Sequence, residues 1–512
     1  MTSAGGGSGG DLATGGDPDD VPDDVPEDDR AAGPPPAAVT AGGTAASHAG
    51  TIFGPSLRGL TIALVASVTL VGSEILAVAT VMPAVGDDLG RAGYGLAFSL
   101  FSVGSIVGVL LAGPATDRIG PWRPYLLGMA LFAGGLAVGA AAPHMAVLVS
   151  GRLLQGLGAG AIPAVSYAVI GTTYPEAVRP RMLAVLSTAW VLPGVIGPGI
   201  AGVVAEQFGW RWVFGGLLPL VVLAAGLAAR PLGRLPAAAP AGPGVSARAG
   251  ERGTLPVLDA IRFAAGVGLL IGAIDRAHLL GAGPLTQALA MAALGVVVAA
   301  RPSQRLLPPG WWRVRRGIAA AVVTRAMLAY AFVAADAFIP LVLTDVRGRS
   351  LTFASLAVSI GTLTWSAGSW VADRTVGRLG PDRLAPVGGG LVAAGVAVQV
   401  LLLVGDIPLP LGLLGVPLAS LGMGMAFTPL AMLVLDQHEQ ANTGVASSWM
   451  SLFELLGFAF GPAVGGSLVA ANPEQPALAE ALGVAFLAGA LVAASTLLLR
   501  RRLHRLARPA IA

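Results

Sequence analysis

The chain contains 512 residues, of which 54% are hydrophobic and 12% are charged, with a formal net charge of +3. Soluble proteins carry about 25% charged residues to cover their surface, so this composition excludes a set of soluble domains and predicts a polytopic membrane protein. The chain has no Cys and no Lys, which excludes disulfides, thiolate metal sites and Schiff-base or phosphate-loop lysines.

Residues 1–56 form an acidic segment with few large apolar side chains. Nine of the 28 acidic residues lie between Asp11 and Asp29. Such a segment buries too little apolar surface to offset its chain entropy, so we predict a disordered cytoplasmic tail. It is either a solvated tail without a specific role or an acidic arm that touches the Arg-rich loops.

Apolar stretches of membrane-spanning length recur from residue 58 onward. A helix needs about 20 mostly apolar residues to cross the hydrocarbon core. Fourteen stretches qualify, which predicts an all-α membrane protein. The seventh contains Arg262 and is separated from the eighth by a short break, so twelve spans remain if both are re-entrant. The predicted spans are 59–84, 94–115, 124–142, 145–171, 183–205, 212–229, 256–274, 281–300, 317–343, 352–372, 384–404, 408–435, 443–470 and 478–499.

The Arg residues between the spans predict the orientation. Positive residues stay on the cytoplasmic side of a membrane. With the first end inside, the inner loops and the segment after the last span hold 21 Arg residues and the outer loops hold five. Both chain ends are therefore predicted to be cytoplasmic. The outer loops contain Arg91, Arg211, Arg276, Arg347 and Arg349.

The loop between the second and third spans carries Gly113, Asp117, Arg118, Gly120 and Arg123 at characteristic spacings. Gly113 would allow a neighbouring helix to approach closely, and Gly120 would permit a tight turn. This pattern resembles a signature of the major facilitator superfamily. The resemblance implies that Asp117 latches two halves of the protein on the cytoplasmic side and releases them as the protein switches. The alternative is a basic loop that only sets topology.

The fourth span carries Arg152 and Gln155, followed by glycines at 156, 158 and 160. This also resembles a superfamily motif, in which the Arg is tied to proton coupling. An Arg within a span usually faces a cavity or a carboxylate, and the glycines would let neighbouring helices approach. The alternative is that Arg152 lies near the outer end of its span and extends to the interface.

The first span places Glu74 nine residues before Pro83. Multidrug exporters of the drug:proton antiporter kind carry an acid at this spacing, although Leu76 and Ala79 depart from their pattern. Glu74 lies near mid-membrane, where a carboxyl group can alternate between protonated and ionised states as a site opens to each side.

A Gly-Pro motif occurs in the fifth span and again in the thirteenth. It resembles the antiporter motif of the same family, completely in the thirteenth span and partly in the fifth. The two spans occupy corresponding places in two six-helix halves, which indicates an internal repeat. Gly and Pro would kink these helices and allow close packing. The motif residues are Gly197, Pro198, Gly202, Gly457, Gly461, Pro462, Gly465 and Gly466.

Three further charged residues lie within spans, namely Arg325, Asp336 and Glu454. Arg325 and Asp336 are eleven residues apart, which places them on one helix face roughly 16 Å from each other. Our hypothesis is that Glu74, Asp336 and Glu454 border a central cavity and that at least one carries the coupling proton. For any single acid, the alternative is a neutral, hydrogen-bonded structural carboxyl group.

Several kinds of chemistry have no sequence signature. No two of the five His residues have metal-ligand spacing, and no phosphate loop is present. We therefore predict no metal, no cofactor, no enzymatic activity and no nucleic-acid partner. Transport would draw on an ion gradient, with protons favoured over sodium. The His residues are His48, His144, His278, His438 and His504.

The resemblance covers residues 58 to about 505 and implies a major facilitator fold of two six-helix bundles with two extra helices between them. It implies a proton-coupled antiporter in the plasma (inner) membrane that exports amphipathic, drug-like molecules, with a monomer as the family default. Alternatives are an exporter of lipids or other envelope components and a proton-coupled nutrient importer. The predicted segments are the tail 1–56, bundle 57–229, linker 230–255, extra helices 256–300, basic loop 301–316, bundle 317–500 and basic tail 501–512.

Overall fold

A computed structural model describes residues 52–55, 57–235, 257–277, 279, 282–435 and 443–503. The acidic tail up to residue 51, most of the linker 230–255 and the end of the basic tail lie outside these ranges. So do His48, His278, His438 and His504.

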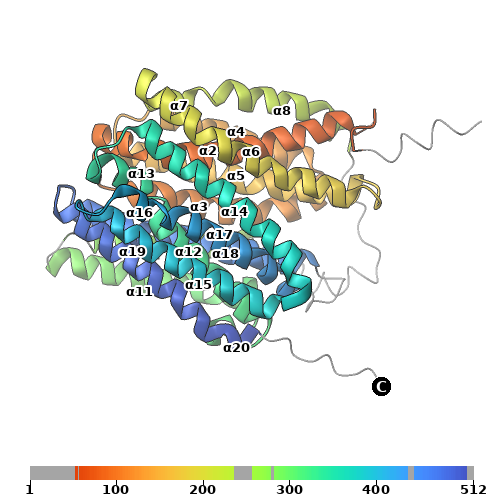
Figure 1. Ribbon diagram of the computed structural model, residues 1–512. Coiled ribbons are helices and arrows are strands. Elements are labelled where there is room, and N and C mark those ends of the chain that lie inside the picture. Colours follow the sequence, from red (N-terminus) through yellow and green to blue (C-terminus); the bar gives the residue numbers. More distant parts are fainter. Residues whose placement is uncertain are drawn as a thin grey trace, which may run out of the picture. The chain divides into compact units, whose positions relative to one another are not determined.

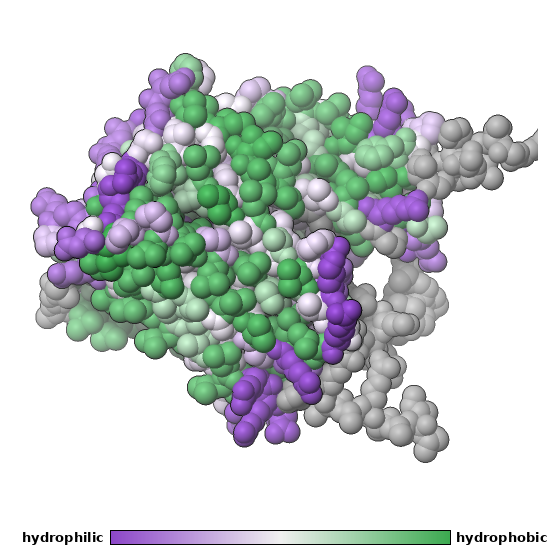
Figure 2. All heavy atoms as spheres, in the orientation of Figure 1, coloured by the Kyte–Doolittle hydropathy of each residue, from purple (hydrophilic) through white to green (hydrophobic). Residues whose placement is uncertain are grey.

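The described residues contain fourteen helices that are long and apolar enough to cross a membrane. The count confirms the predicted spans, including the seventh and eighth. Figure 2 shows purple, hydrophilic residues gathered toward the ends of the molecule and a green, hydrophobic zone between them. A hydrophobic zone of this kind is what a bilayer-embedded surface requires.

The first half contains six of these spans, and α5 lies between α3 and α4 as a packing partner of both. Close approach depends on small residues, because a methyl group at Gly156 would overlap the carbonyl oxygen of Phe101 and one at Gly158 would overlap that of Gly128. The predicted role of these glycines is thereby confirmed. The helices are α2 (Arg58–Leu89), α3 (Tyr94–Ile119), α4 (Trp122–Ala140), α5 (Met145–Thr173), α6 (Arg179–Phe208), the short α7 (Arg211–Gly215) and α8 (Leu218–Gly233).

The second half repeats the six-span arrangement, with α17 packed against α14 and α15, and α12 packed against α18 and α19. Figure 1 shows the first half in red through yellow-green and the second half in teal through blue. The elements are α12 (Ile318–Asp336), α13 (Ile339–Leu341), η2 (Val342–Val346), α14 (Leu351–Leu379), α15 (Pro381–Gln399), η3 (Val400–Leu403), α16 (Leu409–Leu413), α17 (Gly415–Leu435), α18 (Thr443–Ala471), α19 (Ala477–Ser495), η5 (Thr496–Leu499) and α20 (Arg500–Leu503).

The ninth span is interrupted directly after Asp336. Regular helix stops there, resumes for one turn in α13 and continues as the π-helical segment η2. Pro340 explains the break, because it has no amide proton to donate to the carbonyl group of Asp336. The span predicted over 317–343 exists, but the sequence pattern did not predict this irregular end.

The two halves meet along two seams, one between α3 and α18 and the other between α6 and α14. The extra helices α10 (Val257–Arg276) and α11 (Ala282–Leu306) form a hairpin, and α10 packs against both α3 and α18. The hairpin therefore covers the first seam. Helix α11 also continues into the segment 301–316 that was predicted as a loop, and the 3-10 turn η1 (Trp311–Arg313) follows it.

Candidate functional site

The first half contains a buried ion pair between Glu74 of α2 and Arg152 of α5. The exposed fraction of the side chain is 0% for Glu74 and 2% for Arg152. The Arg152 guanidinium also donates to Gln155 Oε1 at 2.8 Å and to the carbonyl oxygen of Ala97 at 3.1 Å. The central carbon of the Arg152 guanidinium lies 4.2 Å from the centre of the Phe101 ring.

These contacts contradict the alternative that Arg152 extends to the membrane interface. The side chain faces a carboxylate inside the protein and does not extend to the membrane interface. Burial removes the hydration of both charges. A buried ion pair is therefore stable only if its geometry and its additional hydrogen bonds compensate for the lost hydration. Glu74 Oε2 and Gln155 Nε2 remain buried without a hydrogen-bond partner among the described residues.

The second half contains a similar pair between Arg325 of α12 and Glu454 of α18. Arg325 Nη2 lies 2.6 Å from Glu454 Oε2, and Arg325 Nη1 donates to the carbonyl oxygen of Phe427 at 3.2 Å. The guanidinium carbon lies 3.9 Å from the centre of the Phe427 ring. This pair is more open than the first, since the exposed fraction is 26% for the Glu454 side chain.

Each half thus holds one Glu–Arg pair with the guanidinium on a phenylalanine ring and bonded to a backbone carbonyl. The sequence located all four charged residues but not their pairing. The three predicted acids are not gathered at one point, because Glu74 and Glu454 each pair with an Arg of their own half. Asp336 stands at the helix break, and its side chain makes no hydrogen bond or ion pair with the described residues. The role of Glu74, Arg152, Gln155, Arg325, Asp336 and Glu454 in coupling stays a prediction.

In the loop motif after α3, Gly120 is placed as expected and Gly113 is not. Gly120 has φ of 80°, a backbone conformation that favours glycine, so it does form the predicted turn. The expectation for Gly113 is wrong, since a methyl group there would meet no atom within 4 Å. Asp117, Arg118 and Arg123 are all exposed, and the described residues give Asp117 no ion pair. Its latch role remains a prediction.

The Gly-Pro motif of α18 packs on two sides. Gly457 and Gly461 contact the backbone of α12, and Gly465 contacts the ring of Phe338. On the other side, Gly466 and the carbonyl oxygen of Pro462 press against α3 at Gly95. The motif therefore seals the seam between the halves as well as packing within one half.

The corresponding part of α6 lies at the other seam. A methyl group at Gly202 would come within 2.7 Å of Ser355 Oγ of α14, and one at Gly194 would overlap Thr362. A methyl group at Gly197 would come no closer than 4.0 Å to another element, so the close contacts of this motif are made at Gly194 and Gly202. Pro198 lies inside α6 between these contacts.

The ends of the two seams beside the α2–α3 turn and the last turn of α6 carry polar bonds between the halves. Arg91, in the turn between α2 and α3, pairs with Asp345 of η2 and donates to the carbonyl oxygen of Pro473. Glu206 of α6 accepts from Thr352 of α14 through the backbone amide at 2.9 Å and through the hydroxyl at 2.7 Å. The protein is therefore held closed on this side.

Sequence reasoning missed this closure and one further buried charge. Arg91 was interpreted only as an outer-loop residue, because nothing in its neighbourhood indicates a partner 254 residues away. The side chain of Asp259 in α10 is 5% exposed and lies 2.8 Å from Arg305, which is in the last turn of α11. An acid in the first turn of a predicted span was a signal that could have identified Asp259.

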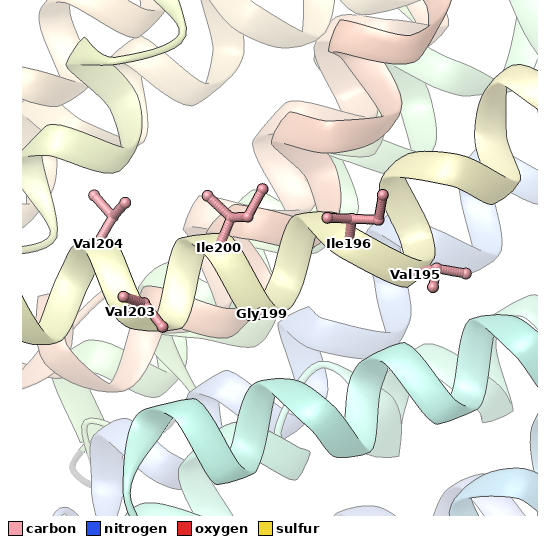
Figure 3. Close-up of a pocket in the computed structure, with 6 residues that line it drawn as sticks. All are labelled: Val195, Ile196, Gly199, Ile200, Val203 and Val204. Atoms are coloured by element: carbon pink, nitrogen blue, oxygen red, sulfur yellow. The ribbon is translucent and has the colours of Figure 1, made fainter.

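A surface pocket of about 480 Å³ lies along α6. Figure 3 shows its lining, in which Ile196, Ile200 and Val204 follow one another at one-turn intervals. The lining has no polar side chain, and Ile200 is 59% exposed. This surface suits contact with lipid chains and offers no group that could orient a polar substrate. Among the described residues, no cluster of His, Asp and Glu could hold a metal ion.

The model of the Major Facilitator Superfamily matches residues 60–462, most of the chain. The chain belongs to this superfamily. It is a multi-pass membrane transporter and not an enzyme.

Two relatives from Mycobacterium tuberculosis are named for multidrug efflux or multidrug resistance. A "probable multidrug-efflux transporter" is 29% identical over 85% of this chain and 93% of its own length. A "multidrug resistance protein" is 26% identical over 76% of this chain and 70% of its own length.

Solved structures of transporters share the fold. An auto-inhibited peptide transporter of the POT family covers 88% of this chain and 99% of its own, with a TM-score of 0.64 and 16% identity. The xylose transporter XylE from E. coli, in a partially occluded inward-open conformation, covers 86% of this chain and 96% of its own, with a TM-score of 0.59 and 14% identity.

Replacing Gly95 with alanine is expected to abolish transport while leaving each half folded. The added methyl group would overlap the carbonyl oxygen of Pro462 and the backbone of Gly466, so the α3–α18 seam could not close. Transport by the purified protein in liposomes measures the loss. Gly134→Ala in α4 is the matched control, because a methyl group there meets nothing within 4 Å. Normal transport by Gly95→Ala would contradict a need for this close contact.

Proposed function

We propose that the protein is a proton-coupled antiporter that exports amphipathic, drug-like small molecules by alternating access. The observation that carries the proposal is the Glu–Arg pair in each half, one sealed and one partly open. When the carboxylate of such a pair takes up a proton, it loses its negative charge. Its attraction to the guanidinium then weakens, and the two helices that carry the pair are less tightly joined.

Glu454 is the acid best placed to exchange protons. Its side chain is 26% exposed, whereas Glu74 has no exposed surface. Proton uptake at Glu454 would weaken its bond to Arg325 and so favour movement of α18 against α12. Because α18 also forms a seam with α3, such movement would be transmitted between the halves.

The substrate class is supported by two observations. Both mycobacterial relatives are named for multidrug efflux or resistance. Fixed polar groups in the membrane are few, which suits amphipathic molecules rather than sugars. The partners in this proposal are such a molecule, protons and the lipid bilayer.

The orientation and organisation are part of the same proposal. We place the protein in the plasma membrane as a monomer with both ends in the cytoplasm, because the inner segments carry most of the Arg residues. The side held closed by Arg91 and Glu206 is then the outer side. Bundles 57–229 and 317–500 would move relative to each other, with the hairpin 256–300 between them.

Transport of a cationic dye by the purified protein in liposomes tests this function. A proton gradient is expected to drive dye movement against the proton flow, and Glu454→Gln is expected to lose the response to the gradient. Glu480→Gln is the matched control, because Glu480 is exposed at the start of α19.

Three results would count against the proposal. Dye movement along the proton flow would indicate an importer. Movement of a labelled phospholipid without movement of dye would indicate a lipid exporter. An unchanged proton response in Glu454→Gln would remove Glu454 from the mechanism.

A further inference from the structure

The second half has a pocket at the end of its spans that lies apart from both Glu–Arg pairs. Its volume is about 600 Å³, and it lies between the first turns of α15 and the segment that runs from η5 into α20. The rim holds Arg383, Arg500 and Arg501, and the wall holds Val387 and Leu497. One site thus combines three guanidinium groups with an apolar wall.

The backbone fixes the shape of this pocket. A methyl group at Gly389 would lie 2.8 Å from Thr496 Oγ1, so α15 and η5 touch there. The next residue, Gly390, has no side chain, and a methyl group there would be 3.9 Å from Leu497. Helix α15 and η5 are therefore in contact at Gly389, and a gap separates them at Gly390.

The contacts on one face of α20 determine where Arg500 and Arg501, on its other face, lie. Leu503 is buried, and Arg502 Nη1 donates to the carbonyl oxygens of Arg313 at 2.9 Å and Val314 at 3.0 Å. The amide of Gly317 also donates to the carbonyl oxygen of Arg502 at 3.1 Å. With this face held against the loop before α12, Arg500 and Arg501 remain on the pocket side.

The described lining carries a net positive charge, because it holds three Arg residues and one acid. Arg383, Arg500 and Arg501 are exposed and make no ion pair with the residues described. The only acid in the lining, Asp382, has an interaction of its own. Figure 2 shows hydrophilic residues gathered beside hydrophobic surface in the region where Figure 1 labels α20.

We propose that this pocket binds the head group of an anionic phospholipid, with an acyl chain along Val387, Leu497 and Pro386. Guanidinium groups bind phosphate through charge-assisted, often bidentate hydrogen bonds. Basic pockets between membrane helices at the water boundary are suited to anionic head groups. The apolar wall selects a lipid over free phosphate, because phosphate alone would leave that wall unfilled.

Native mass spectrometry of the detergent-purified protein with added phosphatidylglycerol or phosphatidylcholine tests the proposal. The triple variant Arg383→Gln, Arg500→Gln, Arg501→Gln is expected to bind phosphatidylglycerol about tenfold more weakly, with phosphatidylcholine binding unchanged. The matched control replaces Arg234, Arg301 and Arg378, three exposed Arg residues outside the pocket, with Gln. This control variant has the same net charge as the pocket variant. It should bind both lipids as tightly as the unsubstituted protein does.

Two further measurements separate a lipid from its phosphate. Gly390→Leu keeps every charge but fills the space beside the apolar wall, so it should also weaken phosphatidylglycerol binding. Millimolar inorganic phosphate should not displace the lipid. Equal weakening by both triple variants, no effect of the pocket triple variant, or full displacement by phosphate would each overturn the proposal. Thermal unfolding of each variant in the same detergent confirms that it is folded.

Discussion

Replacing Glu74 with glutamine is expected to lower the free energy of unfolding by about 3–5 kcal/mol, the usual cost of leaving one partner of a buried ion pair uncompensated. Arg152 would keep its charge with only Gln155, the Ala97 carbonyl and the Phe101 ring around it. Arg152→Gln should destabilise by a similar amount, because the Glu74 carboxylate would then be alone. Thermal or denaturant unfolding in detergent measures both effects.

The double variant Glu74→Leu with Arg152→Met separates stability from transport. Apolar residues of similar volume often replace a buried ion pair at no cost, so the double variant should be more stable than either Gln variant. We expect it nevertheless to lose proton-coupled transport. A double variant that transports normally would show that the pair is only structural. A double variant as unstable as the single ones would contradict the ion-pair explanation.

Replacing Arg91 with alanine is expected to favour the conformation that opens on the side of the Arg91–Asp345 pair by about tenfold, a typical coupling energy for one partly buried contact between two states. Arg91 joins the halves through both Asp345 and the Pro473 carbonyl, and both bonds exist only when this side is closed. Asp345→Asn should act in the same direction with a smaller effect, since it leaves the carbonyl bond in place.

The chain has no Cys, so a single introduced thiol reports this opening without background. Ser99→Cys is suitable because Ser99 is buried in α3, one turn deeper than Gly95. A membrane-impermeant maleimide should label it faster when Arg91 is replaced. Arg211→Ala is the matched control, because its ion pair with Asp88 lies within the first half. Faster labelling in both variants would mean general loosening and would contradict a specific lock.

Much of the fold followed from local properties of the sequence. Apolar length alone predicted fourteen spans, because a helix must satisfy its own backbone inside a bilayer. Residue identity also marked where charge lies in the membrane, since Glu74, Arg152, Arg325 and Glu454 are exceptions within apolar helices. Gly113 shows the limit of such reasoning, since small size permits close packing but does not say whether a neighbour is present.

What the sequence determined by itself was therefore the class of protein, the number of spans and the residues that carry charge inside them. Only the tertiary structure decided the partners, because pairing depends on which helices are neighbours in space. Glu74 and Arg152 are 78 residues apart, and Arg325 and Glu454 are 129 apart. The closure by Arg91 and Asp345 arises from the packing of the two halves, and the Arg-rimmed pocket arises from the packing of α15 against η5 and α20 within the second half.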